Sequence, residues 1–214
     1  MLRATVFLLA LGFVVFLGLE WTGALGEKDI PGKLLSAAFH SVTPRTAGFN
    51  AVPIDNLHDE TEFFMLGLMF IGAGSGSTAG GVKVGTVAVI VATAFSAIRS
   101  REHPEVAHRE IARTDSDRAL AVVFGAGLVV FVVALTLARL EPFTFLPVLF
   151  EATSAFGTVG LSTGITPELS DASLLLLAVT MFIGRLGPLT LILALVQRSG
   201  QASRRLPEER IRIG

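Results

Sequence analysis

The hydrophobic pattern of this chain consists of long uncharged runs instead of the periodic apolar stripes of a soluble domain. Residues 4–19, 84–98, 119–138 and 186–197 contain no charged side chain. A helix needs about 20 apolar residues to cross a bilayer, so runs of this length are typical of membrane-spanning segments. The pattern therefore predicts an all-α integral membrane protein.

The pattern also occurs twice along the chain. The tetrapeptide Met-Phe-Ile-Gly stands at residues 69–72 and again at residues 181–184, 112 residues later. The same offset relates three further identities, which are Thr46 with Thr158, Gly48 with Gly160 and Leu57 with Leu169. Landmarks that agree in one register indicate an internal duplication.

Each repeat begins with an apolar helix, at about residues 4–21 and 119–140. A half-polar segment of some 13 residues follows, at about 31–43 and 142–156, and a second apolar segment closes each repeat at about 62–98 and 172–197. Thirteen helical residues cover only about 20 Å, which is too short to cross a hydrocarbon core of about 30 Å. We therefore predict two tandem helix–re-entrant pore loop–helix repeats. The predicted divisions are residues 1–98 (first repeat, with a broken second helix), 99–118 (cytoplasmic loop), 119–198 (second repeat) and 199–214 (cytoplasmic tail).

The charges predict an orientation in the cell membrane. Most Lys and Arg residues fall at the N-terminus, in the 99–118 loop and in the tail. The positive-inside rule places these parts, and both termini, in the cytoplasm. The protein is therefore expected to be multi-pass, with each repeat crossing the membrane an even number of times. The segments on the opposite side carry a set of acidic residues. These residues either attract cations to a pore mouth or only make the loops soluble. The set is Glu27, Asp29, Asp55, Asp59, Glu60, Glu62, Glu141, Glu168 and Asp171.

The candidate chemistry lies in two Gly/Thr stretches behind the short segments. The first Gly/Thr stretch is residues 46–50 (Thr-Ala-Gly-Phe-Asn), and the second is residues 158–162 (Thr-Val-Gly-Leu-Ser). The second is close to the Thr-Val-Gly-Tyr-Gly element of potassium channels, whose carbonyls replace the hydration shell of the ion. Glycine permits the unusual backbone angles that such carbonyls need. Tight turns at a helix–loop junction are the alternative. The candidate ion-binding residues are Thr46, Ala47, Gly48, Phe49, Thr158, Val159, Gly160 and Leu161.

A glycine-rich loop is predicted at residues 72–81, inside the second apolar segment of the first repeat. Five of its ten residues are Gly, and each Gly costs about 1 kcal/mol relative to Ala in a helix. The alternative is close helix packing through small residues, but such packing requires the small residues to lie on one face of the helix. The glycines here occur on all faces, so we expect the helix to break.

Three charged residues near these segments need partners. Arg185 interrupts an apolar helix, where a charge costs at least about 2.5–3.5 kcal/mol, so it should face water or a partner. Arg45 and Glu151 either pair with each other across the repeats, or Glu20 competes for Arg45. Lys83 faces either the cytoplasmic end of a pore or an adjacent helix.

The motifs together resemble the Trk/Ktr/HKT superfamily of potassium transporters. The matching segments follow both repeats in order and are residues 41–50, 69–72, 76–83, 150–162 and 184–188. Members of that superfamily carry four helix–pore–helix repeats around one pseudo-tetrameric pore, and this chain matches the third and fourth. The resemblance therefore implies that the 214 residues are a fragment, completed by the missing first two repeats or by a second membrane chain.

The resemblance also implies roles for residues that the chemistry leaves open. Residues 72–81 would form an intramembrane gate below a selectivity filter, Arg185 would face the pore beside it, and Arg45 and Glu151 would brace the filter. The gate set is Gly72, Gly74, Ser75, Gly76, Ser77, Thr78, Gly80, Gly81 and Arg185. The implied partners are the lipid bilayer, a homodimeric copy of the full subunit and a cytosolic nucleotide-binding regulatory ring, with no nucleic acid.

The function that follows is uptake of potassium, or of another monovalent cation such as sodium, with K⁺ held by filter carbonyls and no covalent cofactor. Selectivity between K⁺ and Na⁺ depends partly on the missing repeats. Two other interpretations stay open, a secondary transporter of a small solute and a non-conducting accessory subunit. An enzyme is not expected, since the chain has no cysteine and its apolar segments contain no Ser-His or His-Asp arrangement.

Overall fold

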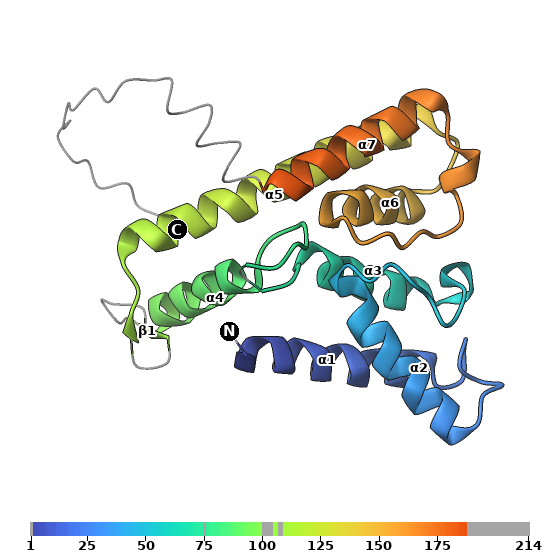
Figure 1. The fold of residues 1–214 in the computed structure, drawn as a ribbon, viewed down its shortest axis with the longest axis horizontal. Helices are drawn as coiled ribbons and strands as arrows, with labels where there is room; N and C mark the ends of the chain where they lie inside the picture. Colours follow the sequence, from blue (N-terminus) through green and yellow to red (C-terminus); the bar gives the residue numbers. More distant parts are fainter. Residues whose placement is uncertain (1, 75, 100–104, 107–108, 188–214) are drawn as a thin grey trace.

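The computed structural model describes residues 2–74, 76–99, 105–106 and 109–187, and in it two helical repeats lie side by side (Figure 1). The first repeat consists of α1 (Leu2–Glu20), α2 (Ile30–Val42), α3 (Asp59–Phe70) and α4 (Val84–Ile98). The second consists of α5 (Arg113–Leu140), α6 (Phe145–Gly157) and α7 (Asp171–Leu186). The connections contain the 3-10 turns η1 (Thr43–Arg45), η2 (Ile54–Asn56) and η3 (Thr166–Glu168), and the antiparallel pair β1 (Glu105–Val106) and β2 (Arg109–Glu110).

Long apolar helices frame each repeat. Of the helices in the described ranges, α1 and α5 are both long enough and apolar enough to cross a membrane. Large apolar side chains point outward from them and from α7, including Phe7 (64% exposed), Phe124 (71%) and Phe182 (66%). An outer surface this rich in aromatic side chains suits lipid and not water.

The start of α5 differs from the sequence prediction. We expected a loop up to residue 118, but the helix begins at Arg113. Its first turns are polar, with Asp115 near the positive end of the helix dipole and 4.0 Å from Arg118 on the next turn. These charges give the extra turns local support that an apolar-run criterion does not detect.

The short helices α2 and α6 each contain 13 residues but lie in different surroundings. Every residue of α6 from Phe150 to Gly157 is buried, because α6 packs against α5, α7 and, across the repeats, α3 (Figure 1). By contrast, α2 packs mainly on α1 and leaves apolar side chains exposed, among them Leu35 at 75%.

One core joins the repeats. Phe16, Met65 and Met69 of the first repeat belong to the same buried cluster as Phe150 and Val159 of the second. The cluster also contains Leu161 of the second Gly/Thr stretch and Val52, which follows the first stretch by two residues.

The second helix of the first repeat is interrupted, whereas that of the second repeat is continuous as far as the structure describes it, and the rest of the expected segment up to residue 197 lies outside the described residues. After α3 ends at Phe70, the glycine-rich loop follows, and α4 starts at Val84, whereas α7 runs without a break from Asp171 to Leu186. The interruption falls where the glycine content predicts a weak helix.

Candidate functional site

A left-handed turn ends each short helix and leads into its Gly/Thr stretch. Thr46 has φ 73° and ψ 28°, and Thr158 has φ 51° and ψ 41°. The amide of Ala47 donates to the Thr43 carbonyl (3.1 Å), and the amide of Val159 donates to the Ser154 carbonyl (2.9 Å). Both stretches therefore begin with their amides turned back toward the short helix.

The backbone then alternates in the sign of φ. Gly48 has φ 75° and Gly160 has φ 91°, so positive φ occurs at the first and third positions of each stretch, while the position between has negative φ. In an ordinary β-strand successive peptide units point to opposite sides, whereas this alternation turns them toward one side. A row of carbonyls on one side is the arrangement that coordinates a dehydrated cation.

The two stretches meet across the repeats. A Cβ atom added to Gly48 would lie 2.6 Å from the carbonyl oxygen of Val159 and 3.4 Å from the Cα of Gly160. Together with positive φ, this contact leaves no room for a side chain at Gly48 without moving the backbone.

The carbonyls that follow the glycines are hydrogen-bonded from behind. Thr43 donates its hydroxyl to the Phe49 carbonyl, and Ser154 donates its hydroxyl to the Leu161 carbonyl at 2.6 Å. Phe49 and Leu161 are equivalent by the 112-residue offset. Each stretch is thus tied to its own short helix just beyond the glycine.

Glu151 braces the second stretch from within its own repeat. Its carboxylate is buried and accepts hydrogen bonds from the Ser162 hydroxyl (2.5 Å), the Thr163 amide (3.1 Å) and the Thr166 hydroxyl (2.8 Å). The pairing of Glu151 with Arg45 that we considered from the sequence is not formed.

Arg45 instead reaches the start of the glycine-rich loop. Its Nη1 donates to the carbonyls of Ile71 (2.7 Å) and Gly72 (3.2 Å). Its Nε and Nη2 are buried without a hydrogen-bond partner among the described residues. Glu20, the other proposed partner, accepts from the amides of Ala24 and His58 and is therefore engaged elsewhere.

The glycine-rich loop is closed at its base and open at its tip. The Gly72 amide donates to the Val82 carbonyl (2.9 Å), and the Val82 amide donates to the Phe70 carbonyl (3.1 Å). Residues 79–82 are buried, whereas residues 76–78 are exposed. Ser75 lies outside the described residues.

Lys83 stabilises the same loop. Its ammonium group donates to the carbonyls of Ala79 and Ser77, the latter at 3.4 Å. The partner of Lys83 among the described residues is therefore the loop and not an adjacent helix. The Gly80 amide also donates to the hydroxyl of Thr158 at 3.1 Å, so the loop contacts the first residue of the second stretch.

Arg185 lies near the loop without binding it. It is exposed and forms no hydrogen bond or ion pair within the described part of the chain, although its charge repels that of Lys83. The preceding Gly184 fixes its position, because an added Cβ would lie 1.8 Å from the Phe156 carbonyl oxygen. Backbone of α7 therefore contacts the end of α6 one residue before Arg185.

Sequence reasoning missed two carboxylates that cap the second helices. Glu20 accepts from the His58 amide (3.0 Å) and the Thr61 hydroxyl (2.6 Å) at the start of α3. At the start of α7, Glu141 accepts in the same way from the Ser170 amide (3.0 Å) and the Ser173 hydroxyl (2.5 Å). The available signal was an acidic residue at the end of each charge-free run, or shortly after it.

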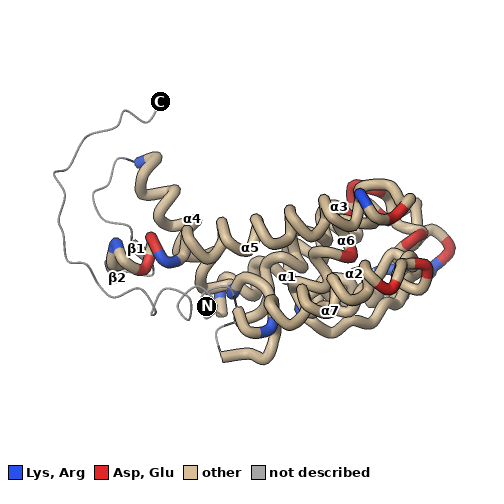
Figure 2. The backbone as a smooth tube through the Cα atoms, turned by 90° about the horizontal axis from the view of Figure 1, so that it is seen from above, with Lys and Arg blue, Asp and Glu red and all other residues tan. Residues whose placement is uncertain are grey.

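The acidic residues divide into two groups. Glu62 and Glu141 belong to the acidic set named in the sequence, yet both are buried. Hydrogen bonds from Ser170 and Ser173 hold the pKa of Glu141 below its usual value. The others are exposed, and Figure 2 shows acidic residues gathered at one end of the bundle. At the opposite end the figure shows basic and acidic residues together around α4, β1 and β2.

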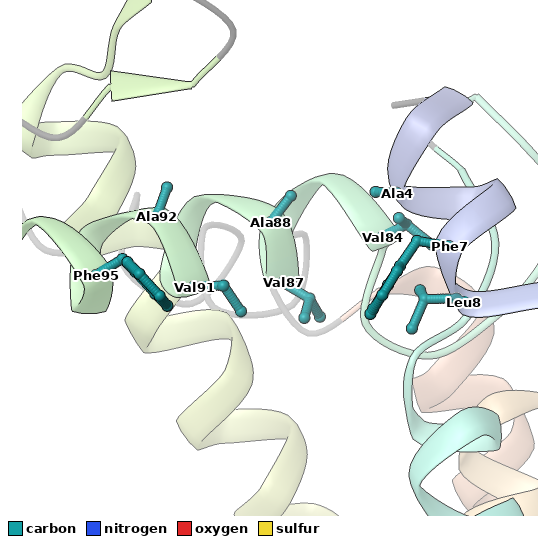
Figure 3. A pocket seen from close by; sticks show the side chains of 9 residues that line it. All are labelled: Ala4, Phe7, Leu8, Val84, Val87, Ala88, Val91, Ala92 and Phe95. Atoms are coloured by element: carbon teal, nitrogen blue, oxygen red, sulfur yellow. The ribbon is translucent and has the colours of Figure 1, made fainter. Parts of the chain in front are cut away.

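An apolar groove between α1 and α4 offers nothing to a cation. It has a volume of about 350 Å³ (Figure 3). Its lining side chains are Ala4, Phe7, Leu8, Val84, Val87, Ala88, Val91, Ala92 and Phe95. None of these side chains carries an oxygen, so the groove offers no side-chain ligand to a cation.

Two repeated short helices, each leading through a left-handed turn into an apposed Gly/Thr stretch, define an integral membrane protein of the pore-loop class. A profile of the TrkH family, described as cation transport protein, matches residues 1–205. This chain belongs to the TrkH family of cation transport proteins.

Relatives and a solved structure agree with that family. Ktr system potassium uptake protein B of Bacillus subtilis is 39% identical over 216 residues, which cover 100% of this chain and 48% of the relative. The potassium/sodium uptake protein NtpJ of Enterococcus hirae is 34% identical over 220 residues, covering 100% and 49%. The crystal structure of the potassium transporter TrkH from Vibrio parahaemolyticus has the same fold, with a TM-score of 0.77, 22% identity and coverage of 93% of this chain and 44% of that one. The chain spans about half the length of the curated relatives it matches.

Proposed function

We propose that this chain is one half of the membrane subunit of a potassium uptake system. In it, K⁺ passes between the carbonyls of residues 46–48 and those of residues 158–160. The observation that carries this proposal is the alternation of positive φ in two repeated, directly apposed stretches. The names of the relatives support potassium as the ion, and NtpJ supports sodium as a second one.

The carbonyls of Phe49 and Leu161 play a supporting part in this proposal. Each is already bound by a hydroxyl from its own short helix. They hold the outer end of the filter, while the three residues before each of them face the ion. Arg45 and Glu151 act behind the filter, one toward the loop and the other toward the outer segment.

The other half of the filter comes from two further repeats or from a second membrane chain. The packing of α6 supports this. Leu146 and Phe150 of α6 join the core that contains α3, and the equivalent residues of α2, Leu34 and Ala38, are exposed. By the logic of the duplication, the exposed face of α2 fits the second helix of a preceding repeat. Dimerisation of the full subunit and a cytosolic nucleotide-binding ring belong to the same proposal through the family resemblance.

The glycine-rich loop acts as the gate of this pathway. Its exposed tip lies between buried arms, and the positive charge of Arg185 is close by. A fixed positive charge below the filter raises the barrier for a cation. A tip without packing moves at little energetic cost, so its position is suited to control by a partner.

The acidic end of the bundle faces outward, and both termini are cytoplasmic. The chain has no cysteine, so single cysteines report the orientation. Cysteines at Asp59 and Glu168 should react with an impermeant thiol reagent on intact cells, and one at Asp115 should not. The reverse labelling pattern would contradict this orientation.

The filter is tested by Gly48→Ser and Gly160→Ser. Both variants are made in a chain completed ahead of Met1 with the first two repeats of the Bacillus relative. A Cβ at Gly48 would clash with the opposed Val159 carbonyl, and both glycines have positive φ, which strains any side chain. Potassium-over-sodium selectivity should therefore fall at least about tenfold, or ~1.4 kcal/mol. Potassium uptake with sodium competing measures it.

Matched controls are Gly67→Ser and Gly127→Ser, since an added Cβ at either residue meets nothing within 4 Å. Both should keep the original selectivity. Unchanged selectivity in the two filter variants, in protein that inserts normally, would remove the filter assignment.

A further inference from the structure

The duplicated threonines of the two Gly/Thr stretches differ in one contact. The hydroxyl of Thr158 accepts a hydrogen bond from the Gly80 amide at 3.1 Å. Thr46 occupies the equivalent place with the same left-handed backbone, yet its hydroxyl has no partner in the described ranges. The loop is therefore tied to one filter stretch by a side-chain oxygen that the other stretch leaves free.

The loop is shaped for this contact. A Cβ at Gly80 would lie 2.7 Å from the Thr158 hydroxyl oxygen and 2.9 Å from the Gly157 carbonyl oxygen. Gly80 is buried, and the following Gly81 has φ 71°, which directs the chain back toward α4. Only a residue without a side chain brings its amide this close to the end of α6.

We propose that Thr158 is a positioning residue that couples the gate to the ion, because its hydroxyl oxygen holds the glycine-rich loop and also lies at the inner end of the filter. A hydroxyl has two lone pairs, and the Gly80 amide uses one. A cation bound at the inner end draws on the same oxygen. Binding of the ion to the Thr158 hydroxyl oxygen therefore weakens the hydrogen bond from the Gly80 amide, and the reverse also holds. Potassium that enters this position thus favours release of the loop. This inference rests on the proposed filter and gate.

The other two anchors of the loop do not respond to the ion. Arg45 binds carbonyls at its beginning, and Lys83 binds carbonyls on its returning arm. Neither side chain supplies an oxygen to the pathway, since both are cationic donors. They keep the loop attached at both ends while the contact at Thr158 opens and closes.

Thiol accessibility measures the contact directly in the completed chain, with the added repeats also made free of cysteine. Ala79 is 5% exposed and lies on the returning arm, whereas Ser77 is at the exposed tip. In Ala79→Cys protein, replacing N-methylglucamine by K⁺ should speed labelling, and Thr158→Val should speed it about threefold to tenfold without K⁺, as loss of one net hydrogen bond allows. Thr158→Val should also abolish the K⁺ dependence. Labelling of Ser77→Cys is the reference and should change little.

Two variants separate coupling from general loosening. Thr158→Ser keeps the hydroxyl and should restore both the slow labelling and its K⁺ dependence. Thr46→Val removes the repeat-related hydroxyl, which does not bind the loop, and should leave labelling at Ala79 in N-methylglucamine unchanged. The coupling is overturned if Thr158→Val labels like the parent, if Thr158→Ser fails to restore the parent behaviour, or if K⁺ has no effect in the parent protein.

The same preparations separate this inference from the proposed function. Selectivity loss in Gly48→Ser, together with unchanged labelling in Thr158→Val, removes the coupling and leaves the filter. Faster labelling in Thr158→Val with a K⁺ effect, but no change of selectivity in the glycine variants, supports the contact and removes the proposed filter.

Discussion

The two repeats have the same order of helices, but the same tetrapeptide has a different structure in each. Met-Phe-Ile-Gly lies inside the unbroken α7 in the second repeat, whereas in the first repeat α3 ends at Phe70. Both final glycines meet backbone oxygen closely, Gly72 against Gly80 and Gly184 against Phe156. The residues that follow decide the outcome, because the glycine-rich loop cannot continue a helix and Arg185-Leu186 can.

The repeats also differ in how a charged group supports each Gly/Thr stretch. Glu151 binds the outer segment of the second repeat. At the equivalent place the first repeat has Phe39, and Lys28 takes over by donating to Ser36 (2.8 Å) and to the Ala51 carbonyl (3.4 Å). The first repeat uses its buried cation, Arg45, for the loop. One repeat is thus braced at the segment that follows its Gly/Thr stretch, and the other at the glycine-rich loop.

The largest effect is expected from Glu151→Ala. The change leaves two hydroxyls and one amide without their buried acceptor, so we expect a loss of about 3 kcal/mol or more in stability. Thermal unfolding followed by size-exclusion chromatography in detergent measures it. Glu168→Ala, at an exposed carboxylate of the same repeat, is the control. Equal stability of the two variants would contradict an outward brace at Glu151.

A gain of flux is expected from opening the gate. Deleting residues 74–78 removes the tip and keeps the arm that binds Thr158 and Lys83, and Arg185→Ala removes the fixed charge. Each change should raise the maximal rate of potassium uptake several-fold, with less effect on apparent affinity, because the filter is untouched. The same variants should depend less on a cytosolic regulatory partner.

Arg139→Ala, at the other end of the bundle, should leave uptake unchanged. If both gate variants abolish flux in protein that inserts and assembles normally, then the loop and Arg185 are structural supports.

Much of the fold follows from the sequence, for physical reasons that can be named. Charge-free runs mark the long helices, the repeat offset aligns the Gly/Thr stretches, and glycine content marks the break after Phe70. The partners of Arg45 and Lys83 could not be predicted from the sequence, because they are backbone carbonyls, which every residue has. The caps Glu20 and Glu141 were missed because they are not 112 residues apart, although the residues that they bind are.

The most direct measurement is the position of the ion itself. Crystals of the completed transporter grown with Rb⁺ or Tl⁺ in place of K⁺ would reveal the ion by anomalous scattering. The account predicts peaks between the carbonyls of residues 46–48 and 158–160, with the innermost peak within reach of the Thr158 hydroxyl. Peaks that avoid both Gly/Thr stretches, in crystals of protein that takes up potassium, would contradict it.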